Sequence, residues 1–254
     1  MGNRYKFTIF LFLFFAFIDI LPADQTPKTS IIIPCYHKHA PFLPNLLDKL
    51  AMQTFIPDEV VISLSEVDLV SDDLLMTLKN GIYPYELVLL ETQEIKWCGQ
   101  NRNLACSVAT GDILICQDAD DIPHPQKIEI IVYFFMNTDA VHILHRWYPS
   151  EKLLKRLSDQ QNETPDFDYL DHYENIHDIP IFKINNFKDK YDFPFISTGY
   201  ASIRKEVFDY VQWPDTQQAE DYKFTYDVIH LFQKTLYLNI PLMIYHQENS
   251  SSIL

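Results

Sequence analysis

The sequence predicts a single-domain α/β fold built on a mostly parallel sheet that is flanked by helices. Short apolar runs rich in Ile, Val and Leu alternate with segments whose apolar residues recur at helical spacing. This alternation is typical of βαβ units, which cover both faces of a parallel sheet with helices. The length of 254 residues fits one large domain.

The apolar runs are interpreted as buried parallel strands, because they are short, continuous and bounded by polar or turn residues. The expected strands are residues 30–33, which Pro34 ends, 59–64, 86–90 and 112–116.

Helices are expected from Pro41 to Leu50, after a Ser71 cap, from Asn101 to Ala109, from Pro125 to Phe135, and from Glu220 onward. The inward residues are predicted to be Leu104, Ala105 and Val108 in one of these helices, and Phe224, Val228, Leu231 and Phe232 in the last. Residues 150–191 are polar and weakly periodic, and we interpret them as a surface excursion.

Residues 1–23 are predicted to be a signal peptide or an uncleaved signal anchor. Arg4 and Lys6 precede the apolar run 7–18, which is shorter than the ~20 residues of a membrane span but suits a signal-peptide core. The folded domain would then be residues 24–254, located in the secretory-pathway lumen (endoplasmic reticulum or Golgi) or secreted. In the anchored alternative, residues 7–21 associate with the membrane.

Composition excludes several classes of protein. The net charge of −15 argues against nucleic-acid binding, and 47% hydrophobic residues exclude a disordered chain. Only 5 glycines occur, without a GxGxxG or P-loop pattern. Among the cysteines, Cys98 and Cys106 are candidates for a disulfide in an oxidising lumen, whereas Cys35 and Cys116 are expected to be small core residues.

Three aspartates, Asp118, Asp120 and Asp121, follow the fourth expected strand. Parallel sheets bind ligands at the carboxyl ends of their strands. Clustered carboxylates repel one another unless a cation compensates, and Mg²⁺ and Mn²⁺ prefer oxygen ligands. A divalent-metal site is therefore one interpretation; a solvated acidic turn before the next helix is the other.

Further motifs occur in a fixed order around this cluster: Ser30–Tyr36, Gly99–Asn103 (Gly-x-x-Arg-Asn), Gly111–Asp121 (a strand and a DxD motif), Ser197–Tyr200 with Ile203–Phe208, and Glu220–Asp221. Together they resemble an inverting family 2 glycosyltransferase with the GT-A fold, whose sheet is Rossmann-like. The resemblance spans residues 30–252. Each motif is weak alone, and their ordered combination carries the resemblance.

The resemblance implies roles for individual residues. Nucleotide-sugar contacts would come from Pro34, Tyr36, Glu66, Arg102, Asp118 and Ala119. Asp120 would ligate Mn²⁺ or Mg²⁺, and His246 would be a further ligand, unless it is an ordinary surface histidine. Asp221, with Glu220 beside it, would deprotonate the acceptor hydroxyl; alone, the pair also fits an ordinary acidic helix start. Gly199 and Tyr200 would face the acceptor.

Two departures from the family pattern bear on specificity. The usual Asp-Asp-Gly-Ser after the second strand is replaced here, with Ser65 or Glu66 as the substitute that reads the base. The Gln-x-x-Arg-Trp motif of processive synthases is missing, which favours addition of a single sugar.

The sequence therefore predicts a metal-dependent, inverting, non-processive glycosyltransferase of the hexosyltransferase type. Its donor would be a nucleotide-diphosphate sugar, with UDP favoured over GDP, and its acceptor a glycan, lipid or protein. The alternatives are a catalytically silent protein that binds sugar nucleotides on the same fold, and a nucleotidyltransferase-like metal and phosphate enzyme.

Overall fold

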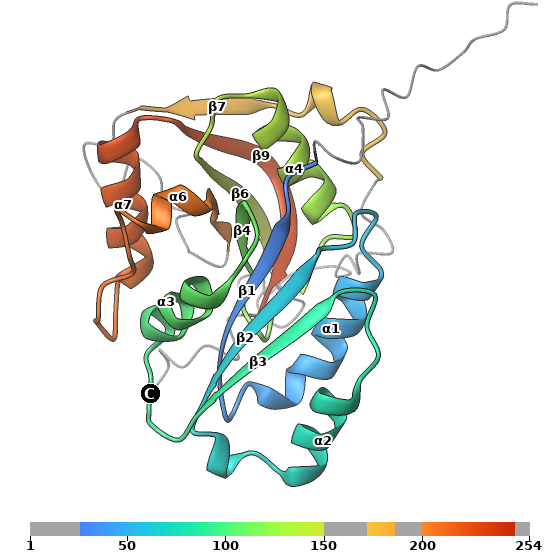
Figure 1. Cartoon of the computed structure of the whole chain (residues 1–254). Coiled ribbons are helices and arrows are strands. Elements are labelled where there is room, and N and C mark those ends of the chain that lie inside the picture. Colours follow the sequence, from blue (N-terminus) through green and yellow to red (C-terminus); the bar gives the residue numbers. More distant parts are fainter. Residues whose placement is uncertain (1–25, 150–171, 186–199, 247–254) are drawn as a thin grey trace, which may run out of the picture.

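A central twisted sheet with helices on both faces forms the molecule (Figure 1). The structure is a computed structural model that describes residues 26–149, 172–185 and 200–246. In these ranges the strand order is β3-β2-β1-β4-β8-β6-β9-β5, and β7 pairs with β9. The expected α/β fold with a mostly parallel sheet is confirmed.

The first half of the sheet matches the four expected strands. They are β1 (Thr29–Tyr36), β2 (Glu59–Ser65), β3 (Glu86–Thr92) and β4 (Ile113–Cys116), and all neighbouring pairs among them are parallel. The prediction that Pro34 ends the first strand is wrong, because β1 continues to Tyr36. Pairing with β4 stops at Ile32, so the missing N–H of Pro34 interrupts no hydrogen bond on that side.

The second half of the sheet consists of β8 (Ser202–Arg204), β6 (His142–Pro149), β9 (Thr235–Tyr245), β5 (Ile122–Pro123) and β7 (Ile181–Ile184). The long strands β6 and β9 pair in parallel, whereas the short strands β8, β5 and β7 pair antiparallel to their neighbours. The interpretation of residues 150–191 as a surface excursion is therefore wrong for Ile181–Ile184, because β7 extends the sheet along β9. The rest of it, residues 150–171 and 186–191, lies outside the described residues.

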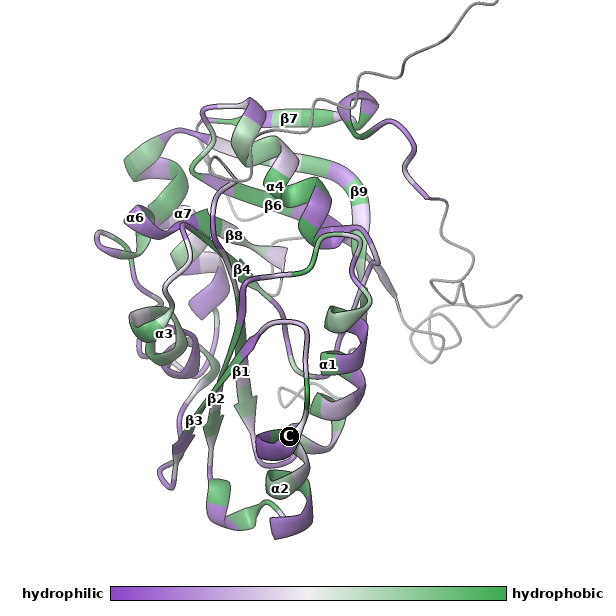
Figure 2. Cartoon of the chain, turned by 45° about the vertical axis from the view of Figure 1, so that its right-hand side comes forward, coloured by the Kyte–Doolittle hydropathy of each residue, from purple (hydrophilic) through white to green (hydrophobic). Residues whose placement is uncertain are grey.

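Helices divide between the two faces of the sheet. One face carries α1 (Leu43–Ala51), α2 (Asp72–Asn80) and α4 (Lys127–Asn137), and the other carries α3 (Cys98–Val108), α6 (Lys205–Phe208) and α7 (Glu220–Phe232). Single turns of 3₁₀ helix occur at η2 (Ala40–Phe42), η3 (Val67–Leu69) and η5 (Ile176–Asp178). Figure 2 shows apolar residues along the strands and the inner helix faces. As expected, Ser71 caps α2, where its hydroxyl accepts from the Leu74 N–H at 3.4 Å.

Two predicted inward residues are exposed. Val108 in α3 is 41% exposed and Leu231 in α7 is 58% exposed. The buried residues of α3 include Asn101, Arg102, Ala105 and Cys106, and those of α7 are Phe224, Thr225, Val228 and Ile229. In each helix this spacing places the buried residues on one face. Val108 and Leu231 lie on the other face and point away from the sheet.

All cysteines are free thiols, so the suggested Cys98–Cys106 disulfide is not formed. Both residues lie in α3, and eight residues of helix separate them by about 12 Å, well beyond the span of a disulfide. Cys35 and Cys116 are buried as expected. Among the described residues no helix is long and apolar enough to span a membrane, and residues 1–25 lie outside them.

Candidate active site

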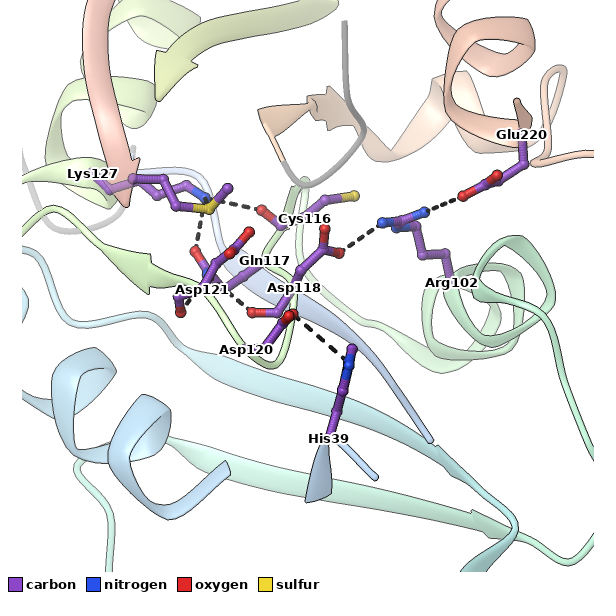
Figure 3. A network of polar contacts seen from close by, with 10 residues as sticks. His39, Arg102, Cys116, Gln117, Asp118, Asp120, Asp121, Lys127 and Glu220 are labelled. Atoms are coloured by element: carbon purple, nitrogen blue, oxygen red, sulfur yellow. Dashed lines mark hydrogen bonds and ion pairs between the residues drawn. The ribbon is translucent and has the colours of Figure 1, made fainter. Parts of the chain in front are cut away.

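The acidic loop, residues Asp118, Ala119, Asp120 and Asp121, follows directly after β4 (Figure 3). It lies at the carboxyl ends of the parallel strands, the edge where such sheets bind ligands. Asp118 keeps 21% of its side chain exposed and Asp120 keeps 9%, whereas Asp121 is 2% exposed as a residue. Asp118 and Asp120 are therefore the carboxylates of this loop that a ligand can reach.

Arg102 links the acidic loop to the start of α7. Its Nη2 lies 2.7 Å from Asp118 Oδ1, and its Nη1 lies 3.4 Å from Glu220 Oε1, a residue 118 positions later in the sequence. The guanidinium side chain is 2% exposed. Figure 3 shows it between the two carboxylates. Tertiary structure thus brings the DxD motif and the Glu-Asp motif to one place.

A close approach between α3 and the segment before α7 makes this bridge possible. Gly99, in the first turn of α3, has so little room that a Cβ there would lie 3.0 Å from Pro214 O. Ala219, directly before α7, has a left-handed φ of 59°. Glu220 and Asp221 then occupy the first turn, where the helix dipole favours negative charge.

Burial and like charges raise the pKa values of the site carboxyls. Burial raises the pKa of Asp120, with Asp118 adding to the effect and His39 and His246 opposing it. Burial also raises the pKa of Asp221, which the Tyr222 N–H and Arg102 partly oppose. Glu220 is raised by burial against the influence of Arg102. The close carboxylates favour a cation near Asp120. The raised pKa also means that the Asp221 carboxylate accepts a proton more readily.

Tyr36 and Glu66 lie at the ends of β1 and β2, on the side of the site expected to bind the nucleotide. Tyr36 packs edge-on against His39, with ring centroids 4.5 Å apart. Glu66 has a left-handed φ of 56°, and its Oε2 lies 3.0 Å from His37 Nδ1. Both expected residues therefore sit among side chains of the β1–α1 connection.

His39 is a site residue that the sequence analysis missed. Its Nδ1 lies 3.7 Å from Asp120 Oδ1. The available signal was the run of basic residues 37–39 directly after the first strand. Because a parallel strand delivers its following loop to the ligand edge, these side chains belong with the other site candidates.

The remaining expected contact residues are mostly buried. Pro34 lies inside β1 opposite Ser63, and Ala119 is 2% exposed. Tyr200 is also 2% exposed and packs against Trp147 and Tyr245, with centroid distances of 6.4 and 6.2 Å. Gly199 lies outside the described residues.

His246 follows β9 and is tied to the acidic loop, because its backbone N–H donates to Asp121 Oδ1 at 2.8 Å. In residues 26–149, 172–185 and 200–246, no group of three or more His, Cys, Asp or Glu side chains is arranged to hold a metal ion. The donors still fit a hard divalent cation, which often takes one or two carboxylates and completes its shell with phosphates and water. The Oδ2 of Asp121 is also buried without a hydrogen-bond partner, and burial raises the pKa of this carboxyl well above its ordinary value.

Comparison with known proteins identifies the family and the fold. The sequence model of glycosyl transferase family 2 matches residues 30–211. The chain belongs to this family. An uncharacterized glycosyltransferase of Haemophilus influenzae is 28% identical to this family 2 member over 116 residues, which are 46% of the chain and 37% of the relative. The chain therefore spans well under two thirds of that relative.

Solved structures show the same GT-A fold. The S. aureus TarS 1–349 structure has a TM-score of 0.63 at 19% identity, over 87% of this family 2 member and 61% of that chain. TarS 1–349 in complex with UDP-GlcNAc has a TM-score of 0.64 at 19% identity, over 89% and 62%. The mannosyltransferase PcManGT from Pyrobaculum calidifontis, in complex with GDP-Man and Mn²⁺, has a TM-score of 0.56 at 18% identity, over 88% and 57%.

Proposed function

We propose that this family 2 member is a metal-dependent, inverting, non-processive glycosyltransferase of the hexosyltransferase type. It transfers one sugar from a nucleotide-diphosphate donor to a hydroxyl group of a glycan, lipid or protein acceptor. The observation that carries this proposal is the bridge from Asp118 through Arg102 to Glu220, because it joins the proposed donor side and acceptor side in one site.

On the donor side, Asp118 and Arg102 bind the nucleotide, and Tyr36 and Glu66 line its base. Asp120 and His246 would hold Mn²⁺ or Mg²⁺. When bound, that cation supplies Lewis-acid stabilisation of the leaving diphosphate. Complexes of fold neighbours support a nucleotide-sugar donor: TarS with UDP-GlcNAc, and PcManGT with GDP-Man and Mn²⁺. We favour UDP over GDP.

On the acceptor side, Asp221 is the general base. An acceptor hydroxyl becomes a competent nucleophile only when a positioned base takes its proton. The raised pKa of Asp221 makes its carboxylate a stronger base. Its Oδ1 accepts a hydrogen bond from the Tyr222 N–H at 2.7 Å, which orients the carboxylate. The hydroxyl oxygen then forms a bond to the anomeric carbon as the bond to the diphosphate breaks, which inverts that centre. Arg102 holds Glu220 beside this position.

The proposed location is the secretory-pathway lumen or the cell exterior, with residues 1–23 as a cleaved signal or as an anchor. The missing Gln-x-x-Arg-Trp motif supports a single transfer per acceptor.

The deciding experiment is calorimetric titration of the purified protein with UDP and with GDP, each with Mn²⁺ or with a chelator. We expect one nucleotide to bind only with the metal. A folded protein that binds neither nucleotide would overturn the proposal. Metal-dependent binding without transfer to any acceptor in a donor and acceptor screen would identify the catalytically silent alternative.

A further inference from the structure

A fully buried ammonium group lies directly behind the acidic loop. Lys127, the first residue of α4, is 1% exposed. Its Nζ donates to Cys116 O at 3.0 Å and to Gln117 Oε1 at 2.9 Å. Figure 3 shows this lysine on the opposite side of the loop from Arg102. The two cations therefore approach the loop from different elements, and only Arg102 has a role in the family pattern described above.

Gln117 connects this ammonium to the backbone of the acidic loop. Its Nε2 donates to Asp118 O and to Asp121 O, each at 3.1 Å. These carbonyls belong to the first and last residues of the loop. An ammonium group can only donate, so its bond to Oε1 fixes the orientation of the amide and directs Nε2 at the two carbonyls. The same turn is closed by the Asp121 N–H, which donates to Asp118 O at 3.3 Å.

Burial of a lysine requires compensation, because removing an ammonium from water is costly. Burial lowers the pKa of Lys127 to about 8, while the negative charges of Asp118 and Asp121 act in the opposite direction. An apolar side chain would fill this position at lower cost. Packing alone therefore does not explain a lysine at this position. Its ammonium group adds a positive charge and orients its hydrogen-bond acceptors.

We propose that Lys127 is a positioning residue of the donor site, which acts through Gln117 to hold the acidic loop in the shape that presents Asp118 and Asp120 to the metal and the nucleotide. This inference rests on the proposed function. It assigns to the start of α4 a role in metal affinity, although no atom of Lys127 needs to touch the ligand.

The test compares Lys127→Met with Lys205→Met. Methionine matches the length of lysine and is compatible with the neighbouring Met243 sulfur, 4.0 Å from Nζ. Lys205 is a matched control, because its Nζ donates to Ala109 O at 2.6 Å near the opposite end of β4. We expect Lys127→Met to raise the Mn²⁺ concentration for half-maximal UDP binding roughly 10–100-fold, as changes around first ligands do. Excess Mn²⁺ should restore binding, and Lys205→Met should bind as the parent protein does.

A double-mutant cycle tests the route through Gln117. If the lysine acts through this amide, Gln117→Met should weaken metal-dependent nucleotide binding. The double variant should then bind as well as whichever single variant binds less tightly. Multiplicative effects would overturn the proposal, and so would an unchanged Mn²⁺ requirement or an equal loss in Lys205→Met. If Lys127→Met does not fold, Gln117→Met alone decides, because the proposal requires it to raise the Mn²⁺ requirement.

Hydrogen exchange separates this inference from the proposed function. In the protein without nucleotide or metal, peptides covering residues 117–122 should exchange faster in Lys127→Met, or in Gln117→Met, than in the parent and in Lys205→Met. Unchanged exchange would overturn the positioning role whether or not any nucleotide binds. Faster exchange in a protein that binds no nucleotide would keep the role of Lys127 and reject the proposed function alone.

Discussion

The guanidinium of Arg102 lies 2.7 Å from the Asp118 carboxylate, and its second nitrogen reaches Glu220 at 3.4 Å. One buried cation thereby balances carboxylates from the loop after β4 and from the start of α7. Its removal would leave Asp118, Glu220 and Asp221 close together without compensation. The stability of the fold and the geometry of the site therefore depend on the same residue.

Arg102→Met is expected to lower the free energy of unfolding by about 3–5 kcal/mol, the usual cost of breaking a buried ion pair by removing one partner. Urea denaturation at neutral pH measures this. Lys223→Met is the control, because Lys223 pairs with Asp227 on the exposed side of α7 and should contribute less than about 0.5 kcal/mol. Equal losses in the two variants would contradict the bridging role.

Asp120→Asn is expected to weaken the Mn²⁺-dependent binding of UDP roughly tenfold or more, because it removes the charge of the proposed metal ligand. The same change relieves repulsion, since burial raises the pKa of Asp121 and the charge of Asp120 raises it further. Stability without metal should therefore stay equal or rise. Calorimetry and thermal unfolding measure the two effects. Loss of stability together with unchanged metal dependence would be the opposite result.

Asp221→Asn is expected to leave the Kd for the donor nucleotide nearly unchanged and to lower transfer by roughly 10²–10⁴-fold, since the base acts only in the transition state. Nucleotide release in the presence of an acceptor measures transfer. Asp227→Asn, further along α7, is the control. Near-full transfer by Asp221→Asn would identify another base.

The pH dependence of transfer provides a second check on Asp221. Because burial raises the pKa of Asp221, the acid limb of the rate profile should lie above the ordinary aspartate range. Transfer is expected to fall as pH decreases through that raised pKa. A profile that stays flat down to the ordinary range would exclude a buried carboxylate as the base.

His142→Gln is expected to reduce the loss of stability on acidification. His142 is buried in β6, and burial lowers its pKa to about 3, so the folded state keeps it neutral while the unfolded state binds a proton below about pH 6.5. The contribution of His142 to the free energy of unfolding is fully present above pH 6.5 and is lost as the pH falls toward 3. At pH 5 the loss is about 2 kcal/mol. Denaturation curves at pH 7 and pH 5 should differ less in His142→Gln, whereas the exposed His177→Gln should behave as the parent does.

The first half of the fold was predictable because its information is local. The strands β1 to β4 are continuous apolar runs, and Ser71 marks the start of α2 by a cap that needs only neighbouring residues. The second half was less predictable, because β5 has 2 residues and β8 has 3, too few to form an apolar pattern of their own. Short strands such as β5 and β8 depend on partners that lie far away in the sequence.

By itself, the sequence determined the α/β class, the acidic loop after β4 and the order of the motifs that indicated glycosyl transferase family 2. Only the tertiary structure decided which side chains meet: Arg102 with Asp118 and Glu220, His39 with Asp120, and Lys127 with Gln117. The physical reason is that strand and helix patterns arise from periodic burial over a few residues. Pairing of buried charges instead depends on close approaches between distant segments, such as that of Gly99 to Pro214.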